Sequence, residues 1–235
     1  MRAAVIVLGI ALNLFASSDR AQAQSNIAGP AYVVTYIEVA PEMAPKAAAL
    51  LRGYRARAAK EAGYIGLATL QRRGPANHFA LLEAWADRNA ADAHAVGEDS
   101  RQFVATLQPM LIAPIDTRPH GGLAADDART RAAISKMSAG TIYVLTHVDM
   151  IPSGKEAGLV AVIELAAASG KEAGNAAFAV LQQTSRPNHL TLFEAWQGEK
   201  AFGAHAARDF VKAYRTKLTP MSGALYDQRT YQALR

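Results

Sequence analysis

The stretch NHFALLEAWADRNAADAH, residues 77–94, returns as NHLTLFEAWQGEKAFGAH at residues 188–205. Both copies begin with Asn-His, contain the triplet Glu-Ala-Trp, and carry a histidine nine residues after the tryptophan. The shift that takes Asn77 to Asn188 also takes His94 to His205, and it holds at every shared position between them. A motif of this length that keeps one spacing throughout indicates that a larger unit of the chain has been duplicated.

The duplication extends beyond this motif. At the same shift, Lys60-Glu61-Ala62-Gly63 recurs as Lys171-Glu172-Ala173-Gly174, and the Leu-x-Pro-Met that starts at Leu107 recurs from Leu218. The repeated unit spans residues 31–120 and again 142–231, so the chain contains two copies of one domain.

Each copy has the pattern typical of the element order β-α-β-β-α-β. In the first copy Gly63 ends the first helix and Pro109 the second. The predicted elements are strands at 31–39, 65–72, 78–85 and 111–118, and helices at 44–60 and 90–107, the second interrupted near Gly97.

This order predicts an α+β fold of two tandem ferredoxin-like domains, each with a four-stranded antiparallel sheet that carries both helices on one face. The strands are largely apolar on both sides, so the other sheet face would leave a large apolar surface in water. We therefore expect the two sheets to pack together as an intramolecular dimeric α/β barrel. The linker, residues 121–141, contains either a surface helix at 124–136 or a flexible tether.

Residues 1–23 have the layout of a secretory signal peptide. Arg2 is followed by an apolar run at 3–16, and Ala21-Gln22-Ala23 is a small-residue cleavage site. This run is shorter than the roughly 20 residues of a spanning helix, although an uncleaved membrane anchor is the alternative. We expect an exported protein, periplasmic or secreted, with no stable membrane insertion after cleavage.

The composition restricts the chemistry of the mature chain. There are no cysteines, which excludes disulfides, thiol catalysis and thiolate metal sites. The formal charge of +5 includes no run of Lys or Arg, so nucleic acid is not an expected partner. The sequence has no glycine-rich phosphate loop, dinucleotide fingerprint or Cys/His ligand cluster, and so it is compatible with chemistry that needs neither a cofactor nor a metal.

The unit Asn-His-x-x-Leu-x-Glu-Ala-Trp-(x)8-His, with its flanking Lys-Glu-Ala-Gly and Leu-x-Pro-Met, resembles the antibiotic biosynthesis monooxygenase (ABM) family. This family belongs to the dimeric α/β-barrel superfamily and includes small quinol monooxygenases. Its members are usually homodimers of one domain, and the resemblance implies that the two copies of this chain form the equivalent dimer within one chain. The resemblance implies a cofactor-independent monooxygenase. A pocket between sheet and helices would hold a phenol, quinol or polyketide, which reduces O2 once its proton is removed.

His94 and His205 are the candidate catalytic bases. Each follows its tryptophan by nine residues and lies early in the second predicted helical region. An imidazole titrates near neutral pH and can accept a phenolic proton there. The alternative is a histidine at the helix surface that only caps a backbone carbonyl.

Two other repeated pairs are candidates for substrate binding. Trp85 and Trp196, the only tryptophans, could stack on an aromatic substrate, or they belong to the core. Asn77 and Asn188 open the third strand of each copy and could bind substrate, although asparagine is also a common turn former.

Glu83 and Glu194 lie on the same strand face as these tryptophans by two-residue alternation. A carboxylate on a half-buried strand needs a partner. That partner is either a histidine or an arginine such as Arg118 or Arg229, and we expect the arginine.

Tyr36 and His147 occupy equivalent positions on the first strand but differ chemically. If this strand face lines the pockets, both residues contact substrate and the two pockets are chemically different. The haem-degrading members of the superfamily have a functional histidine at the positions of Val104 and Arg215, so that activity is disfavoured.

These observations predict an enzyme that acts on a small aromatic substrate with O2. Two other functions remain open. One is a non-catalytic module that binds an aromatic or haem-like ligand, and the other is a structural duplicate with degenerate sites.

Overall fold

The computed structural model describes residues 29–125 and 127–234; the predicted signal peptide, residues 1–23, lies outside the described residues. The first copy consists of β1 (Ala31–Glu38), α1 (Ala44–Ala58), β2 (Tyr64–Arg72), β3 (His78–Trp85), α2 (Arg88–Ala95), α3 (Glu98–Leu107) and β4 (Asp116–Ala125). Helix α4 (Asp127–Ser135) follows. The second copy consists of β5 (Ile142–Asp149), α5 (Lys155–Ser169), β6 (Asn175–Gln183), β7 (His189–Trp196), α6 (Glu199–Ala206), α7 (Asp209–Leu218) and β8 (Asp227–Ala233). Within the described ranges, no helix is both long and apolar enough to span a membrane.

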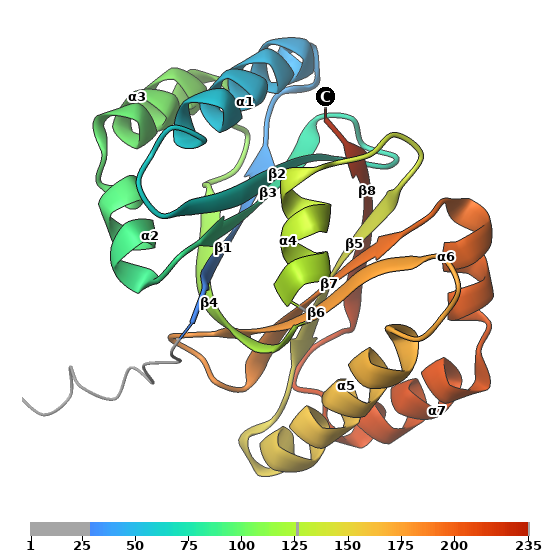
Figure 1. Ribbon diagram of the computed structural model, residues 1–235. Helices are drawn as coiled ribbons and strands as arrows, with labels where there is room; N and C mark the ends of the chain where they lie inside the picture. The colour runs from blue at the N-terminus through green and yellow to red at the C-terminus, as the bar shows by residue number, and fades with distance from the viewer. Residues whose placement is uncertain (1–28, 126, 235) are drawn as a thin grey trace, which may run out of the picture.

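The eight strands form one closed antiparallel barrel in the order β1-β3-β2-β8-β5-β7-β6-β4 (Figure 1). The sheets of the two copies join edge to edge, because β2 pairs with β8 and β4 pairs with β6. The predicted fold is confirmed. Closure also removes the edges that each sheet alone would leave open for pairing with another chain.

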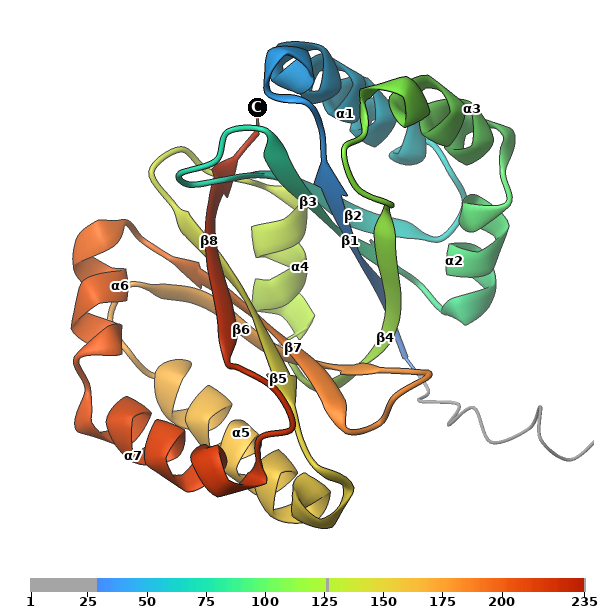
Figure 2. The same cartoon turned by 180° about the vertical axis from the view of Figure 1, so that it is seen from behind.

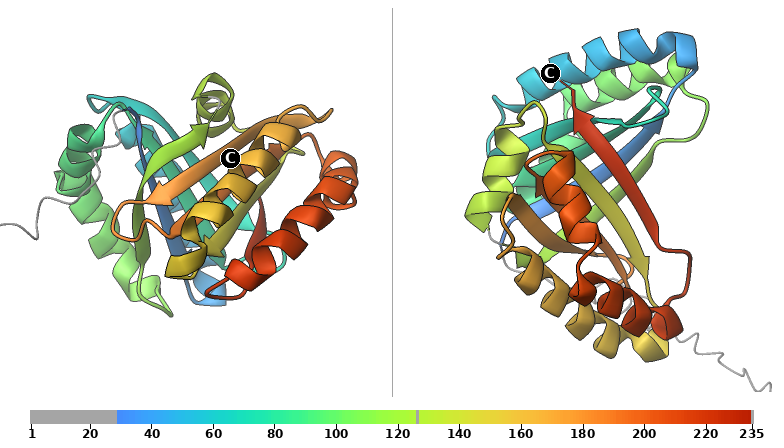
Figure 3. Two further views of the ribbon diagram at one scale, coloured as in Figure 1. Left: turned by 90° about the horizontal axis from the view of Figure 1, so that it is seen from below. Right: turned by 90° about the vertical axis from the view of Figure 1, so that its right-hand side faces the viewer.

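Alternation along the strands divides the side chains into separate layers. Tyr32, Val34 and Tyr36 of β1 belong to the barrel interior, which both copies share, whereas Ile37 belongs to the core beneath the helices of copy 1. Helices α1–α3 cover one side of the barrel and α5–α7 the other (Figure 3). Each copy therefore has its own helix–sheet core outside the common interior.

The second helical region of each copy is broken into two helices. In copy 1, α2 ends at Ala95, and Gly97 is the N-cap residue of α3. A Cβ added at Gly97 would lie 3.1 Å from the carbonyl oxygen of His94, so glycine allows the tight turn. The break leaves each histidine in the last turn of a short helix, α2 or α6.

The linker contributes helix α4, which lies across one end of the barrel (Figures 1 and 2). Ile134 of α4 is fully buried among the interior side chains. Arg129 donates to the carbonyl of Gly170 at 2.9 Å, and Arg55 donates to that of Ser135 at 2.7 Å. The joining segment is thus a plug that is hydrogen-bonded to both copies.

Candidate functional site

Each copy has a cavity between its helices and the outer face of its sheet. The cavity of copy 2 has a volume of about 380 Å³, and its lining includes Leu165, Glu194, His205, Arg215 and Tyr226. The cavity of copy 1 has about 160 Å³, and its lining includes Tyr54, Glu83, His94, Ser100 and Val104. Both histidines that the sequence singles out as bases therefore face a cavity, in the place where the family resemblance puts a pocket.

A carboxylate holds one ring nitrogen of His205 in copy 2. Nδ1 of His205 lies 2.5 Å from Oε1 of Glu172, and Nε of Arg208 donates to the other oxygen of Glu172 at 2.9 Å. Because Glu172 accepts the Nδ1 proton, the lone pair of neutral His205 is on Nε2. Nε2 faces Glu194, whose Oε2 lies 3.6 Å away.

Trp196 supports both His205 and Glu194. The Trp196 and His205 rings are stacked, with centroids 4.3 Å apart and 27° between the planes, and the indole N–H donates to Oε2 of Glu194 at 2.9 Å. Burial raises the pKa of Glu194 to about 7, although the hydrogen bond from Trp196 lowers it. A carboxyl group that titrates near neutral pH thus lies beside the imidazole.

The four equivalent residues meet in copy 1. Nδ1 of His94 lies 2.9 Å from Oε2 of Glu61, and Nε2 lies 3.5 Å from Glu83. Trp85 donates to Glu83 at 3.0 Å, and its ring centroid lies 4.4 Å from that of His94. The duplication therefore preserves a constellation of two glutamates, one histidine and one tryptophan.

The copies differ in the group that contacts Nε2, the histidine nitrogen that is not bonded to Glu61 or Glu172. In copy 1 the hydroxyl of Tyr54, on α1, lies 2.6 Å from Nε2 of His94 and 3.1 Å from Oγ of Ser100. Burial raises the pKa of Tyr54 well above its usual value, so its neutral hydroxyl donates to Nε2. In copy 2 the equivalents of Tyr54 and Ser100 are Leu165 and Val211, which cannot make these bonds.

The partner of each strand glutamate differs from the expected one. Glu83 and Glu194 bond to tryptophan and face histidine, whereas Arg118 and Arg229 pair with aspartates, one of them Asp116. The arginine pairing is wrong because Arg118 pairs across the ladder with Val34, which faces the barrel interior. Glu83 faces the helices, on the other side of the sheet.

Sequence reasoning missed the two glutamates that orient the histidines. Glu61 and Glu172 belong to the Lys-Glu-Ala-Gly repeat, which served only as a marker of the duplication. The glycine of this repeat adopts φ values of +76° at Gly63 and +84° at Gly174, which favour glycine. The glutamate is present in both copies, at 61 and 172, and this repetition was the only hint of a role in the sequence. Nothing in the sequence placed its carboxylate beside the histidine of the next helix.

The predicted substrate-binding tryptophans and asparagines do not line either cavity. Trp85 and Trp196 are fully buried, and each packs its ring against the ring of the histidine in its own copy. The side-chain amides of Asn77 and Asn188 donate to the carbonyls of Val39 and of Met150, each at 2.7 Å. These asparagines tie the start of one strand to the end of its neighbour.

Tyr36 and His147 lie in the barrel interior, on the opposite face of the sheet from the two histidine cavities. The structure brings them to each other, with ring centroids 5.2 Å apart in an edge-on arrangement. The guanidinium groups of Arg118 and Arg229 lie 5.5 and 5.2 Å from the Tyr36 ring centroid. The two pockets would differ through this mismatch only if the strand face lined them. Neither residue lines either helix-facing cavity, because strand alternation turns both inward.

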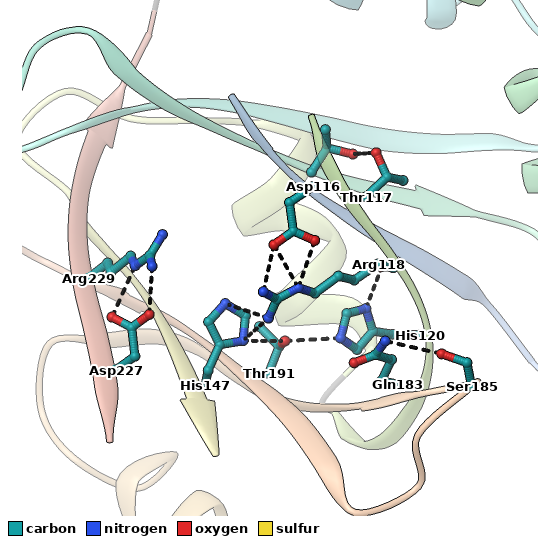
Figure 4. Close-up of polar contacts among 11 residues, drawn as sticks. Asp116, Thr117, Arg118, His120, His147, Gln183, Ser185, Thr191, Asp227 and Arg229 are labelled. Carbon is teal, nitrogen blue, oxygen red and sulfur yellow. Dashed lines mark hydrogen bonds and ion pairs between the residues drawn. The ribbon is translucent and has the colours of Figure 1, made fainter. Parts of the chain in front are cut away.

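The barrel end opposite α4 carries a polar network (Figure 4). Arg118 donates to Asp116 at 2.6 Å, and its Nη1 lies 3.1 Å from Nδ1 of His147. Burial, together with the charges of Arg118 and Arg229, lowers the pKa of His147 to about 3. A cavity of about 800 Å³ opens here. His147 is therefore neutral and weakly basic at pH 7, whereas each helix-facing cavity contains a histidine that bonds to a carboxylate.

Among residues 29–125 and 127–234, no three His, Asp or Glu side chains converge in a way that could hold a metal ion. Each site offers a histidine and a glutamate beside a cavity, with an indole packed against the imidazole. This arrangement can bind a planar aromatic molecule and take a proton from it.

The family model described as antibiotic biosynthesis monooxygenase matches residues 30–106 and 141–217, so it covers both copies. A comparison with curated proteins gave no significant match.

Several solved structures have a similar fold. A provisionally named monooxygenase from Fusobacterium nucleatum is 17% identical, with a TM-score of 0.75 over 89% of this chain and 94% of that one. A provisionally named monooxygenase from Lactobacillus acidophilus is 15% identical, with a TM-score of 0.70 over 88% and 95%. An anthrone oxidase-like protein is 15% identical, with a TM-score of 0.63 over 88% and 92%. At these identities the likeness shows a shared fold.

Proposed function

The chain belongs to the antibiotic biosynthesis monooxygenase family, and we propose that it oxidises a phenol or quinol with O2 in the cavity of its second copy. His205 is the base that takes the phenolic proton, and no cofactor takes part. Tyr54 closes the cavity of the first copy. Family membership supports monooxygenase chemistry; the substrate class and the choice of copy are our proposal.

The contact between Tyr54 and His94 carries this proposal. Tyr54 is a phenol whose hydroxyl lies 2.6 Å from an imidazole nitrogen. His205 has the same glutamate and tryptophan partners as His94, but its Nε2 meets no phenol among the described residues. Its cavity is also larger, at about 380 Å³ against about 160 Å³. A phenolic substrate in copy 2 would repeat the contact that Tyr54 makes in copy 1.

The surroundings of His205 suit a general base. Glu172 accepts the Nδ1 proton at 2.5 Å and so favours the tautomer with its lone pair on Nε2. The same carboxylate stabilises the imidazolium once Nε2 has taken a proton. Arg208 holds Glu172 in place through its second oxygen. The base is therefore positioned before substrate arrives.

Proton removal makes the substrate a reductant strong enough for O2. The phenolate passes one electron to O2, and the resulting phenoxyl and superoxide radicals join at a ring carbon. The O–O bond of this adduct then breaks. One oxygen atom remains on carbon as the new carbonyl, and the other leaves as water with the O–H and C–H hydrogens of the substrate. One phenol and one O2 give one quinone and one water, so no further reductant is needed.

Glu194 is suited to the second proton of this reaction. Two protons must reach the departing oxygen, and His205 carries only one of them. With a pKa of about 7, Glu194 can both release and accept a proton at neutral pH. Its hydrogen bond to Trp196 keeps it beside the imidazole.

Oxygen consumption with a panel of hydroquinones tests the proposal. The variants are His205→Ala, His94→Ala and the double variant. His78→Ala is a matched control, because His78 pairs with Glu38 at 3.4 Å and lines neither helix-facing cavity. We expect His205→Ala to lower kcat/KM by about 10²-fold or more, the usual contribution of a general base. His94→Ala and His78→Ala should stay within about twofold of wild type, because neither residue serves the working cavity.

Equal rates in wild type and the three cavity-histidine variants would reject His205 as the base. Quinol binding without any O2 consumption would instead support the non-catalytic binding module.

A further inference from the structure

We infer that the substrate carries an acidic group, a carboxylate in the first instance, which binds Arg215 at the rim of the copy 2 cavity. This inference rests on the proposed function, because it describes the molecule that occupies the same cavity. It adds a charge requirement that a simple quinol does not meet.

Arg215 is a cation without a carboxylate partner among the described residues. It lines the cavity, and its guanidinium carbon lies 3.4 Å from the ring centroid of Tyr226. Stacking occupies the face of a guanidinium group. The Tyr226 hydroxyl also accepts a hydrogen bond from Arg215, and the remaining N–H groups of the five are available to a ligand. A planar carboxylate can accept two parallel hydrogen bonds from such groups. Tyr226 thus holds Arg215 ready for an anion.

Tyr226 connects this cation to the reacting end of the cavity. Burial raises the pKa of Tyr226 to about 12, with Glu194 acting in the same direction and Arg215 in the opposite one. Glu194, His205, Tyr226 and Arg215 line the same cavity. One ligand bound there can therefore contact both the acid–base groups and the cation.

A second cation lies on the same rim. Lys212, one helical turn before Arg215 on α7, also lines the cavity, and its ammonium group lies 3.2 Å from Asp209. Residues three apart on a helix are neighbours on its surface. Lys212 therefore adds positive potential beside Arg215, although Asp209 offsets part of it.

Copy 1 lacks every part of this device. Val104 and Ile115 stand at the positions of Arg215 and Tyr226, and both line an apolar rim. Arg101, the equivalent of Lys212, bonds to Glu98 and to the carbonyl of Val96, and it does not line the cavity. The cations are thus specific to the copy in which the histidine is free, as expected if they serve its substrate.

Binding of gentisate tests the inference, because gentisate is a hydroquinone with a carboxylate and its methyl ester is the uncharged match. Calorimetric titration under nitrogen gives the affinity of each compound without turnover. We expect gentisate to bind wild type roughly tenfold more tightly than the ester, as for one charge-assisted pair at a partly exposed site. Arg215→Val, which installs the copy 1 residue, should remove this difference, and Arg215→Lys should keep part of it.

The matched control is Arg101→Ala, which removes one positive charge from copy 1 outside its cavity. It should leave the tenfold preference unchanged. A preference that persists in Arg215→Val, or that Arg101→Ala removes equally, overturns the inference.

Turnover separates this inference from the proposed function. If both compounds bind equally and both are oxidised, the carboxylate requirement is wrong and the monooxygenase proposal stands. If gentisate binds through Arg215 and no quinol is oxidised, the acidic-ligand site stands and the proposed reaction is wrong.

Discussion

The two copies contain the same Glu-His-Glu-Trp constellation and differ at the position that decides access to the histidine. In copy 1 Tyr54 bonds to His94 from within the chain, whereas in copy 2 Leu165 leaves Nε2 of His205 facing a cavity. The residues that build the site are thus retained in both halves. The residue that opens or closes it is not.

Fusion of the two domains makes this difference available. In a homodimer both sites have the same sequence, so a substitution that closes one also closes the other. In a tandem chain each copy can change separately, while both remain necessary for the barrel through the β2–β8 and β4–β6 pairs. Copy 1 can therefore serve stability while copy 2 serves chemistry.

Blocking the cavity of copy 2 should have the largest effect on activity. Leu165→Tyr places a phenol where Tyr54 stands in copy 1, so its hydroxyl should bond to His205 and block the substrate. We expect kcat/KM for quinols to fall by about 10²-fold, as for loss of the base itself. Ile163→Tyr, which adds a phenol at an exposed site of the same helix, is the control and should retain full activity. Full activity in Leu165→Tyr would contradict the claim that a tyrosine at this position blocks the histidine.

Opening copy 1 should have the next largest effect. Tyr54→Leu frees Nε2 of His94 and removes a ring that stacks on Phe103 with centroids 4.0 Å apart. In a His205→Ala background we expect at least about tenfold recovery of O2 consumption, since a second base becomes accessible. The cost should be about 2 kcal/mol in the free energy of unfolding, measured with urea.

The recovered activity must depend on His94. If adding His94→Ala to this double variant leaves the recovery intact, the second site is not the one described.

The strand glutamates should differ in their effect on stability with pH. Burial raises the pKa of Glu194 from its usual 4.5 to about 7, so the folded protein binds more protons than the unfolded chain between these values. The stability that this group contributes is complete below pH 4.5 and is lost as the pH rises through about 7, by on the order of 3 kcal/mol. Urea unfolding at pH 5 and pH 8 should show that Glu194→Gln lacks this loss.

Glu83→Gln provides the comparison in copy 1. Burial also raises the pKa of Glu83, but the neighbouring His94 and the hydrogen bond from Trp85 lower it, and we expect a smaller change with pH. An identical pH dependence for wild type and Glu194→Gln would contradict the assigned cause.

A substitution in the barrel interior should have the smallest effect on activity. The hydroxyl of Tyr36 is buried and has no hydrogen-bond partner among the described residues. Tyr36→Phe should therefore keep activity within about twofold and raise the free energy of unfolding by up to about 1 kcal/mol. A large loss of kcat in this variant would show that the interior, and not only the outer face, takes part in the reaction.

Much of the fold could be predicted because it depends on patterns that the chain repeats. The element order of each copy follows from local periodicity, and the apolar sheet faces require a partner sheet. The closing pairs, such as Leu70 with Ala233, depend on contacts between distant residues that no local pattern records. Helix α4 contains few apolar residues, so its sequence did not predict that Ile134 would be buried in the barrel interior.

The site was predictable only in part. Each repeated histidine lines a cavity between helices and sheet. The contact of Tyr54 with His94, however, joins residues of two helices that are 40 positions apart in the sequence, and no local pattern records it. The mismatch of Tyr36 and His147 was visible in the sequence, yet its location depended on which strand face turns inward. A residue that differs between the copies can be found in the sequence. Whether that residue lies in a cavity depends on the packing of the strands and helices.

The stoichiometry of quinol binding tests the central claim most directly. Wild-type protein is titrated calorimetrically under nitrogen with the hydroquinone of highest kcat/KM, and Leu165→Tyr is titrated in parallel. Our account predicts one bound quinol per wild-type chain and none in Leu165→Tyr. Two bound quinols per wild-type chain, or one that persists in Leu165→Tyr, would contradict it.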